Sequence, residues 1–216
     1  MDKNKIFEEF NIHLLNDSKP SMYFNDISEK EEYKEIYPLN FLWDLKETDQ
    51  NLTHHPEGTV WNHTMLVLDQ AAKFRHLSEE PRVFMWAALL HDIGKAPTTK
   101  VRKGKITSYN HDKVGQNMAV IFLKELMLIE DSDFIYKVAD LVRWHMQPLF
   151  IVKNMPFAEI DRMLEEVSAD EIALLAICDR VGRGKMTDEK AKEEIDSIER
   201  FLLRAKERAK KLEYSH

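Results

Sequence analysis

Six side chains of metal-ligating type recur along this sequence at positions that favour the interior of a helical protein. The clearest are His91 and Asp92, which follow the apolar run 87–90 and precede Gly94. Burying a polar side chain costs several kcal/mol unless a partner satisfies it, and a divalent cation would satisfy an imidazole and a carboxylate together. We therefore interpret this pair as the start of a metal site.

The other candidate ligands occupy the apolar faces of four further predicted helices. Each belongs to a stripe of apolar side chains at a spacing of three to four residues, so each is expected to point toward the core. A single polar residue on such a face is usually structural, but unrelated polar positions would not fall on separate apolar faces so regularly. The complete set is His63, His91, Asp92, His111, His145 and Asp179.

The donor types of this set limit the metal. Neutral imidazole nitrogens together with carboxylate oxygens suit Zn, Fe, Mn, Ni or Co, and Mg is a further candidate. A helical bundle can present ligands from several helices to a binuclear centre. We therefore predict divalent metal ions, with two as the more economical number.

The elements that must position these ligands are mainly helical. The sequence is rich in Leu, Ala, Met, Glu and Lys, with six glycines and seven prolines, a balance that favours helix over sheet. Thr59 is a predicted N-cap, and 168–171 reads as a capping box. Hydrophobic periodicity predicts helices over 3–15, 60–77, 81–93, from 110, from 131 to the break at 148, 156–167, from 168, and 187–212.

One short β-hairpin is expected among these helices. A Lys-Gly turn at 103–104 separates two β-prone arms within 100–107. The predicted fold class is therefore all-α, a helical bundle with a small β-hairpin insertion after the His91-Asp92 pair. We divide the chain into an N-terminal helical segment that packs on the core (1–50), a metal-binding domain (51–186) and a C-terminal helix laid over it (187–216).

Composition excludes several classes of protein. The net charge of −7 argues against an extended nucleic-acid footprint, although a small phosphorylated ligand remains allowed. The single cysteine, Cys178, permits no internal disulfide. No apolar run approaches the ~18 residues of a membrane span, and the N-terminus lacks a signal-peptide core. We therefore expect a soluble, cytoplasmic protein of undetermined oligomeric state.

The ordered ligand set resembles the HD superfamily of metal-dependent phosphohydrolases, in the form with two additional histidines after the His-Asp pair. The resemblance covers residues 58–185 and is closest to the HD domain attached to bacterial tRNA nucleotidyltransferases. It implies an HD-type bundle with one metal held by His63, His91, Asp92 and Asp179. A second metal would be held by His111 and His145 and bridged to the first by Asp92.

The segments that carry the resemblance also limit what it implies. They are 58–64, 91–95, 109–115 and 143–145. No upstream segment resembles the glycine-serine turn and following Asp-x-Asp strand of a nucleotidyltransferase, so we expect only the hydrolytic activity to carry over.

The resemblance implies a phosphatase or phosphodiesterase that acts on a nucleotide or another small phosphate ester, with attack of metal-bound hydroxide on phosphorus. Asp92 and Lys95 are the predicted catalytic residues, and Lys95, Arg143 and Arg183 the predicted substrate contacts. Further candidates for phosphate contact or proton transfer are His54, His55, Lys100, Arg102, Lys105, Arg180 and Lys185. Three alternatives remain: hydrolysis of dinucleoside polyphosphates, RNA end processing, and a non-catalytic nucleotide-binding module.

Overall fold

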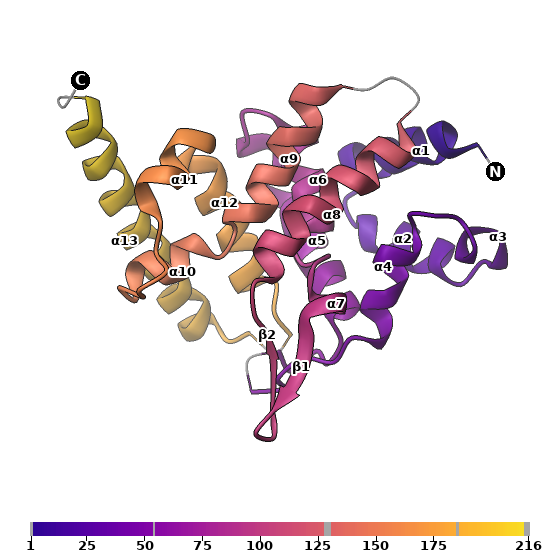
Figure 1. Cartoon of the computed structure of the whole chain (residues 1–216), viewed down its shortest axis with the longest axis horizontal. Helices are drawn as coiled ribbons and strands as arrows, with labels where there is room; N and C mark the ends of the chain where they lie inside the picture. The colour runs from indigo at the N-terminus through magenta and orange to yellow at the C-terminus, as the bar shows by residue number, and fades with distance from the viewer. Residues whose placement is uncertain (1, 54, 128–130, 185, 214–216) are drawn as a thin grey trace.

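The computed structural model describes residues 2–53, 55–127, 131–184 and 186–213. Within these ranges the protein is a bundle of helices with one two-stranded antiparallel sheet (Figure 1). The predicted all-α class with a hairpin insertion is confirmed. Two candidate residues, His54 and Lys185, lie outside the described ranges. None of the described helices is both long enough and apolar enough to span a bilayer.

Helix α6 (Pro81–Leu90) is the centre of the bundle. Its residues from 83 to 90 are all buried, because the segment is apolar on every side and other helices surround it. Helices α5 (Val60–Phe74), α9 (Ser132–Trp144) and α12 (Ala169–Val181) pack against it, and α8 (His111–Leu126) packs against α9. A short 3-10 helix, η2 (Arg75–Leu77), extends α5. These helices carry or adjoin all six candidate ligands.

Helix α1 (Lys3–Asn16) covers another side of α6. Phe7 and Phe10 stack on Trp86 with ring centroids 5.1 Å and 6.0 Å apart, and Trp86 Nε1 donates to Asn11 Oδ1 at 2.7 Å. The N-terminal helices therefore share the hydrophobic core with α6. The elements that follow α1 are α2 (Pro20–Ser28), α3 (Glu31–Lys34), α4 (Asn40–Trp43) and the 3-10 helix η1 (Asp44–Glu47).

The C-terminal part of the chain lies on the opposite side of the bundle from α1 (Figure 1). Helices α10 (Gln147–Val152) and α11 (Ile160–Glu166) lead from α9 to α12. The long helix α13 (Asp188–Glu213) packs on α10, α11 and α12. It buries Ile198, Phe201 and Ala205 and leaves its charged face in solvent.

The hairpin projects from one end of the bundle (Figure 1). A single helical turn, α7 (Lys95–Thr98), leads into β1 (Thr99–Arg102), which pairs with β2 (Lys105–Ser108). Lys103 and Gly104 at its tip have φ values of 50° and 74°. Positive φ at both central residues is the property of a type I′ turn, whose twist matches that of paired strands.

Two of the predicted helix boundaries and the predicted capping box differ from the structure. Helix α6 ends at Leu90 rather than near 93, so the His-Asp pair lies in the turn that follows it. Helix α11 begins at Ile160 rather than at 156. The capping box does not form: Glu171 instead accepts hydrogen bonds from Ser78 Oγ and the Glu79 N–H, both at 2.8 Å.

Replacement of Trp86 tests the role of α6 as the centre of the bundle. Trp86 is fully buried, so Trp86→Ala is expected to lower the free energy of unfolding by about 3–5 kcal/mol through lost contacts and a residual cavity. Urea titration followed by far-UV circular dichroism measures the change. Leu203→Ala is the control, because Leu203 is 61 % exposed; it should change stability by less than about 0.5 kcal/mol. Equal effects of the two replacements would contradict the assignment.

Candidate metal centre

The first histidine of the site is set by the start of α5. Thr59 caps this helix, since its side chain accepts from the Asn62 N–H at 3.3 Å, and the predicted N-cap is confirmed. His63 therefore lies in the first turn of α5 and is fully buried. Its ring points toward the turn after α6.

Gly94 allows the start of α8, which follows the hairpin, to pack closely against the turn that contains His91 and Asp92. A Cβ atom on Gly94 would overlap the carbonyl oxygen of His111 and lie 2.6 Å from the Gly115 N atom. Only glycine allows this approach. The first turn of α8 is thereby held against the end of α6, which places His111 beside Asp92.

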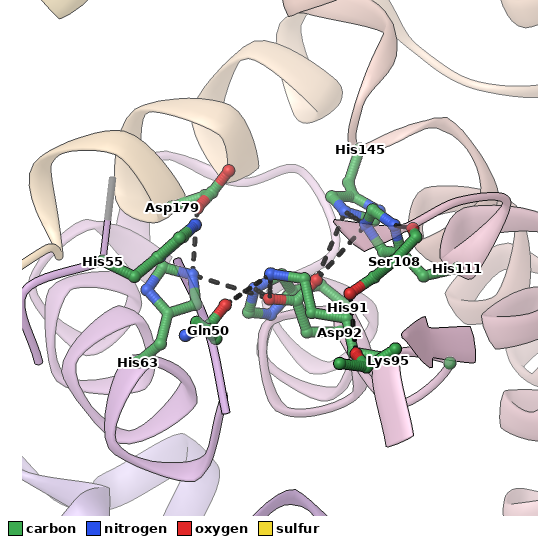
Figure 2. Close-up of polar contacts among 12 residues, drawn as sticks. Gln50, His55, His63, His91, Asp92, Lys95, Ser108, His111, His145 and Asp179 are labelled. Carbon is green, nitrogen blue, oxygen red and sulfur yellow. Dashed lines mark hydrogen bonds and ion pairs between the residues drawn. The ribbon is translucent and has the colours of Figure 1, made fainter. Parts of the chain in front are cut away.

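Asp92 lies between two pairs of histidines (Figure 2). Its Oδ2 atom is 3.2 Å from His91 Nε2 and 3.7 Å from His63 Nε2. Its Oδ1 atom is 3.4 Å from His111 Nε2 and 3.7 Å from His145 Nε2. The two oxygens of one carboxylate thus face two separate groups of potential metal ligands.

Asp179, on α12, completes the group around Oδ2 of Asp92. Its Oδ1 atom lies 3.0 Å from His63 Nε2. All six residues predicted to hold metal are thus brought together in one buried cluster. Within this set, two triads have donor atoms close enough to share an ion: His63, His91 and Asp92, and Asp92, His111 and His145. A third group that meets the same criterion joins His63 to His55 and Glu57.

The four imidazole rings are oriented by hydrogen bonds from their other nitrogen. The Nδ1 atom of His91 contacts the Ala88 carbonyl at 2.9 Å, and that of His63 contacts Glu57 Oε1 at 2.9 Å. In the same way, His111 Nδ1 bonds to Ser108 O at 2.7 Å and His145 Nδ1 to Val142 O at 2.6 Å. A carbonyl or carboxylate oxygen only accepts, so each Nδ1 carries the hydrogen. In a neutral ring the lone pair is then on Nε2, facing Asp92.

These lone pairs have no adequate protein partner. The Nε2 atoms of His63 and His91 are buried and make no hydrogen bond within the described part of the chain. His111 Nε2 and His145 Nε2 lie 3.2 Å apart, yet neither has a hydrogen to donate when its Nδ1 is protonated. Buried polar atoms without partners are rare in folded proteins. A divalent cation in each triad would satisfy them, so the cluster fits divalent metal binding.

Two of the four histidines, His111 and His145, are held in the neutral form that can bind a metal. Burial lowers the pKa of His145 to about 4, with a further contribution from His111, and burial also lowers the pKa of His111. These two rings are therefore neutral at pH 7. At His63 burial acts in the same direction, but the carboxylates of Asp179 and Glu57 outweigh it and raise the pKa.

The two ligand carboxylates are held ionised. Burial alone would raise the pKa of Asp92, but the nearby Lys95 and His91 reverse this and hold it well below its usual range. Burial also opposes ionisation of Asp179, and Arg183 contributes most to lowering its pKa well below the usual range. Metal ions bind carboxylates in this ionised form.

The cluster opens into a pocket of about 480 Å³, here called the polar pocket. Lys95 lines it, with Nζ 2.7 Å from both Asp92 Oδ2 and Gln50 Oε1. Arg183 also lines it, with Nη2 3.7 Å from Asp179 Oδ1 and a buried Nε that makes no hydrogen bond in the described ranges. Both residues are therefore placed to meet an anion in the pocket.

Arg143 differs from this pattern. It is 4 % exposed, is absent from the lining of the polar pocket, and donates to Asp112 Oδ2 at 2.6 Å and Glu159 Oε1 at 3.0 Å. Its guanidinium also stacks on the Trp144 ring. The substrate contact predicted for Arg143 therefore has no support in this geometry, because all of its polar contacts brace α8 and the segment before α11.

Of the four further cationic candidates in the described ranges, two line the polar pocket and two do not. Lys105 and Arg180 line the polar pocket, whereas Lys100 and Arg102 do not. Arg102 instead lies over the ring of Tyr109. The hairpin thus contributes one cation to the pocket, from β2.

Glu57 was missed by the sequence analysis. Its Oε1 accepts from His63 Nδ1 and, at 3.1 Å, from His55 Nδ1, while Oε2 accepts from the Gly184 N–H at 3.1 Å. Burial opposes the charge, but these histidine hydrogen bonds lower the pKa of Glu57. The available signal was a carboxylate in the turn before α5, the helix that carries the first ligand. Carboxylates that orient metal-ligating histidines in this way are common.

The fold and the site define a helical domain with a buried His/Asp cluster that fits divalent metal binding. The sequence matches the HD domain family over residues 60–184, more than half of the chain, and the protein belongs to this family. HD domains form a superfamily of metal-dependent phosphohydrolases, and the family match spans all six candidate ligands.

Several relatives carry the name multifunctional CCA protein. The protein from Mannheimia succiniciproducens is 28% identical over 181 residues, covering 78% of this chain and 41% of the relative. That from Actinobacillus pleuropneumoniae serotype 5b is 35% identical over 82 residues, covering 38% of this chain and 19% of the relative. That from Alkalilimnicola ehrlichii is 35% identical over 95 residues, covering 44% and 21%. The aligned parts thus span less than half of each relative.

Replacement of Glu57 tests whether it orients His63 for metal binding. Glu57→Gln keeps the shape but removes the charge and one acceptor, so metal affinity should fall about 10–100-fold with helix content unchanged. Competition with a metal-binding dye measures this affinity. Glu171→Gln is the matched control, because Glu171 is also a partly buried carboxylate with two hydrogen bonds, but these bonds come from Ser78 and Glu79 and not from a histidine of the cluster. An unchanged affinity in Glu57→Gln would contradict the assigned role.

Proposed function

We propose that this protein is a metal-dependent phosphohydrolase that acts on a nucleotide or another small phosphate ester. One observation carries the proposal: four histidine Nε2 lone pairs converge on the two oxygens of Asp92. Two ions sharing one bridging carboxylate suit the displacement of a group from phosphorus. His63, His91, Asp92 and Asp179 would hold one ion, and Asp92, His111 and His145 the other.

The metal ions and the side chains would have separate roles in the reaction. Bound divalent ions lower the pKa of coordinated water and offset charge on phosphate oxygens. Asp92 fixes the spacing of the two ligand groups, because both of its oxygens are engaged. The hydrogen bonds at Nδ1 hold the four imidazoles in the binding tautomer.

Cationic side chains supply the phosphate contacts in this proposal. Lys95 and Arg183 lie at the edge of the ligand cluster, within ion-pair distance of Asp92 and Asp179 respectively. An ammonium or guanidinium there neutralises charge on a bound phosphate without competing for a metal. Lys105 and Lys153 line the pocket farther out and add to its positive charge.

Two other functions compete with this proposal. A hydrolase of dinucleoside polyphosphates would use the same centre on a longer substrate, and a non-catalytic module would bind a nucleotide without turnover. A panel of a 2′,3′-cyclic nucleotide, a nucleoside monophosphate and a dinucleoside tetraphosphate separates them. Stabilisation by a ligand that is never hydrolysed would favour the non-catalytic module.

Replacement of Asp92 tests the shared carboxylate. Asp92→Asn keeps the side-chain volume but removes the negative charge and replaces one oxygen with an amide nitrogen, so hydrolysis of p-nitrophenyl phosphate or its bis ester should fall at least about 10³-fold. Circular dichroism should show the same helix content. Asp69→Asn is the control, since Asp69 accepts two hydrogen bonds from Ser21 and lines neither the cluster nor the polar pocket. Full activity in Asp92→Asn would exclude the proposal.

The number of ions can be measured directly. Elemental analysis after reconstitution with Mn, Fe, Co, Ni, Zn or Mg is expected to give about two metals per chain for the best-fitting ion. Removal of the metal with a chelator should lower the melting temperature, because ions that bind only the folded state stabilise it. Less than about half an equivalent with every metal would exclude the binuclear version.

A further inference from the structure

A second cavity, of about 390 Å³, adjoins the polar pocket. Ser108, His111 and Met146 line both spaces, so the second cavity lies directly beside the cluster that contains His111. We call it the aromatic cavity. Its volume falls within the range of about 300–1,000 Å³ that is typical of small-molecule sites.

Aromatic and sulfur-containing side chains form the apolar part of the lining of the aromatic cavity. Phe150 and Phe157 pack edge to face with centroids 4.6 Å apart. Phe157 remains 48 % exposed and Tyr109 63 % exposed, although large aromatic rings gain most from being covered. Met146 and Met155 add adaptable apolar surface.

The segment that carries Phe157 is fixed by hydrogen bonds. The Met155 N–H donates to the Phe150 carbonyl at 2.9 Å, and the Glu159 N–H donates to Gln147 Oε1 at 2.8 Å. The exposed ring is therefore presented by an ordered turn between α10 and α11. A planar ligand meets a preformed surface, which limits the entropy lost on binding.

The charges of the two spaces differ. The polar pocket is lined by three acidic residues and by five cationic ones, which are Lys95, Lys105, Lys153, Arg180 and Arg183. The aromatic cavity has one cationic lining residue, Lys113, and two acidic ones, Asp112 and Glu159, and the Lys113 ammonium lies 3.8 Å from Glu159 Oε1. A phosphate is therefore attracted to the polar pocket, while an uncharged aromatic group is suited to the second space.

We infer that the aromatic cavity binds the base of a nucleoside phosphate whose phosphate lies at the metal centre, with the base packed against Phe157. This inference rests on the proposed function and narrows its substrate to one with an aromatic base. Asn110 offers a polar group for the base edge: its side chain lines the cavity and makes no cap hydrogen bond to α8. The backbone at Asn110 is left-handed, with φ of 60°, which Asn tolerates better than most residues.

Binding of adenosine tests the cavity without any turnover. Saturation-transfer NMR on the purified protein should detect adenosine, and Phe157→Ala should weaken its affinity about tenfold, since stacking on an aromatic ring contributes about 1–3 kcal/mol per base. Tyr136→Ala is the control, because Tyr136 is also a half-exposed aromatic residue but lines neither cavity. It should bind adenosine as the wild type does. Absent binding, or equal binding in Phe157→Ala, would overturn the inference.

Hydrolysis distinguishes this inference from the proposed function. Adenosine 5′-monophosphate and ribose 5-phosphate share the sugar and the phosphate and differ in the base. We expect the wild type to show a KM about tenfold lower for the nucleotide, and Phe157→Ala to lose this preference through a higher KM for the nucleotide. Hydrolysis of both esters with equal KM values would reject the base site and keep the phosphohydrolase. Adenosine binding without hydrolysis of any phosphate ester would reject the phosphohydrolase and keep the base site.

Discussion

Convergence of four imidazole lone pairs on one buried carboxylate is the constraint on which the rest of the structure depends. The Nε2 atoms of neutral imidazoles and the carboxylate oxygens are all acceptors, and their mutual repulsion is weakly screened in a protein interior. Helices α5, α6, α8, α9 and α12 must nevertheless bring them together, and α6, which is buried from residue 83 to 90, is the common surface against which most of them pack. Cations would turn this repulsion into attraction, so the binding of metal and the stability of the bundle are coupled.

Sequence periodicity was sufficient to place most of this cluster. In a long helix, apolar residues spaced three to four positions apart identify the buried face from the sequence alone. His63 and Asp179 lie within such helices, and His145 directly follows one. The turn that carries His91 and Asp92 was not predictable in the same way. Its shape depends on the contact between Gly94 and the start of α8, across the whole hairpin. Local patterns contain no information on such a contact.

Charged residues near the motifs were the hardest to assign. Arg143 lies next to a predicted ligand-bearing segment, yet it is buried in an ion pair with Asp112 and packs on Trp144. Glu57, in a turn without periodicity, proves to contact His63. Whether a charge faces the substrate or another side chain depends on tertiary neighbours. Arg143 braces the start of α8 through Asp112, and Glu57 orients the ring of His63 on α5. Both residues therefore help to position the histidine cluster.

The close contact at Gly94 determines which part of this fold can change in length or sequence. The chain enters the hairpin at α7 and leaves it at His111, and the backbone on either side of the excursion already touches at its base. Insertions, deletions or exchanges at the tip therefore leave the spacing of the buried histidines undisturbed. They would nevertheless remodel the rim to which Lys105 belongs. The fold therefore separates the buried His/Asp cluster, which depends on the contact at Gly94, from an exposed hairpin whose length and sequence can vary.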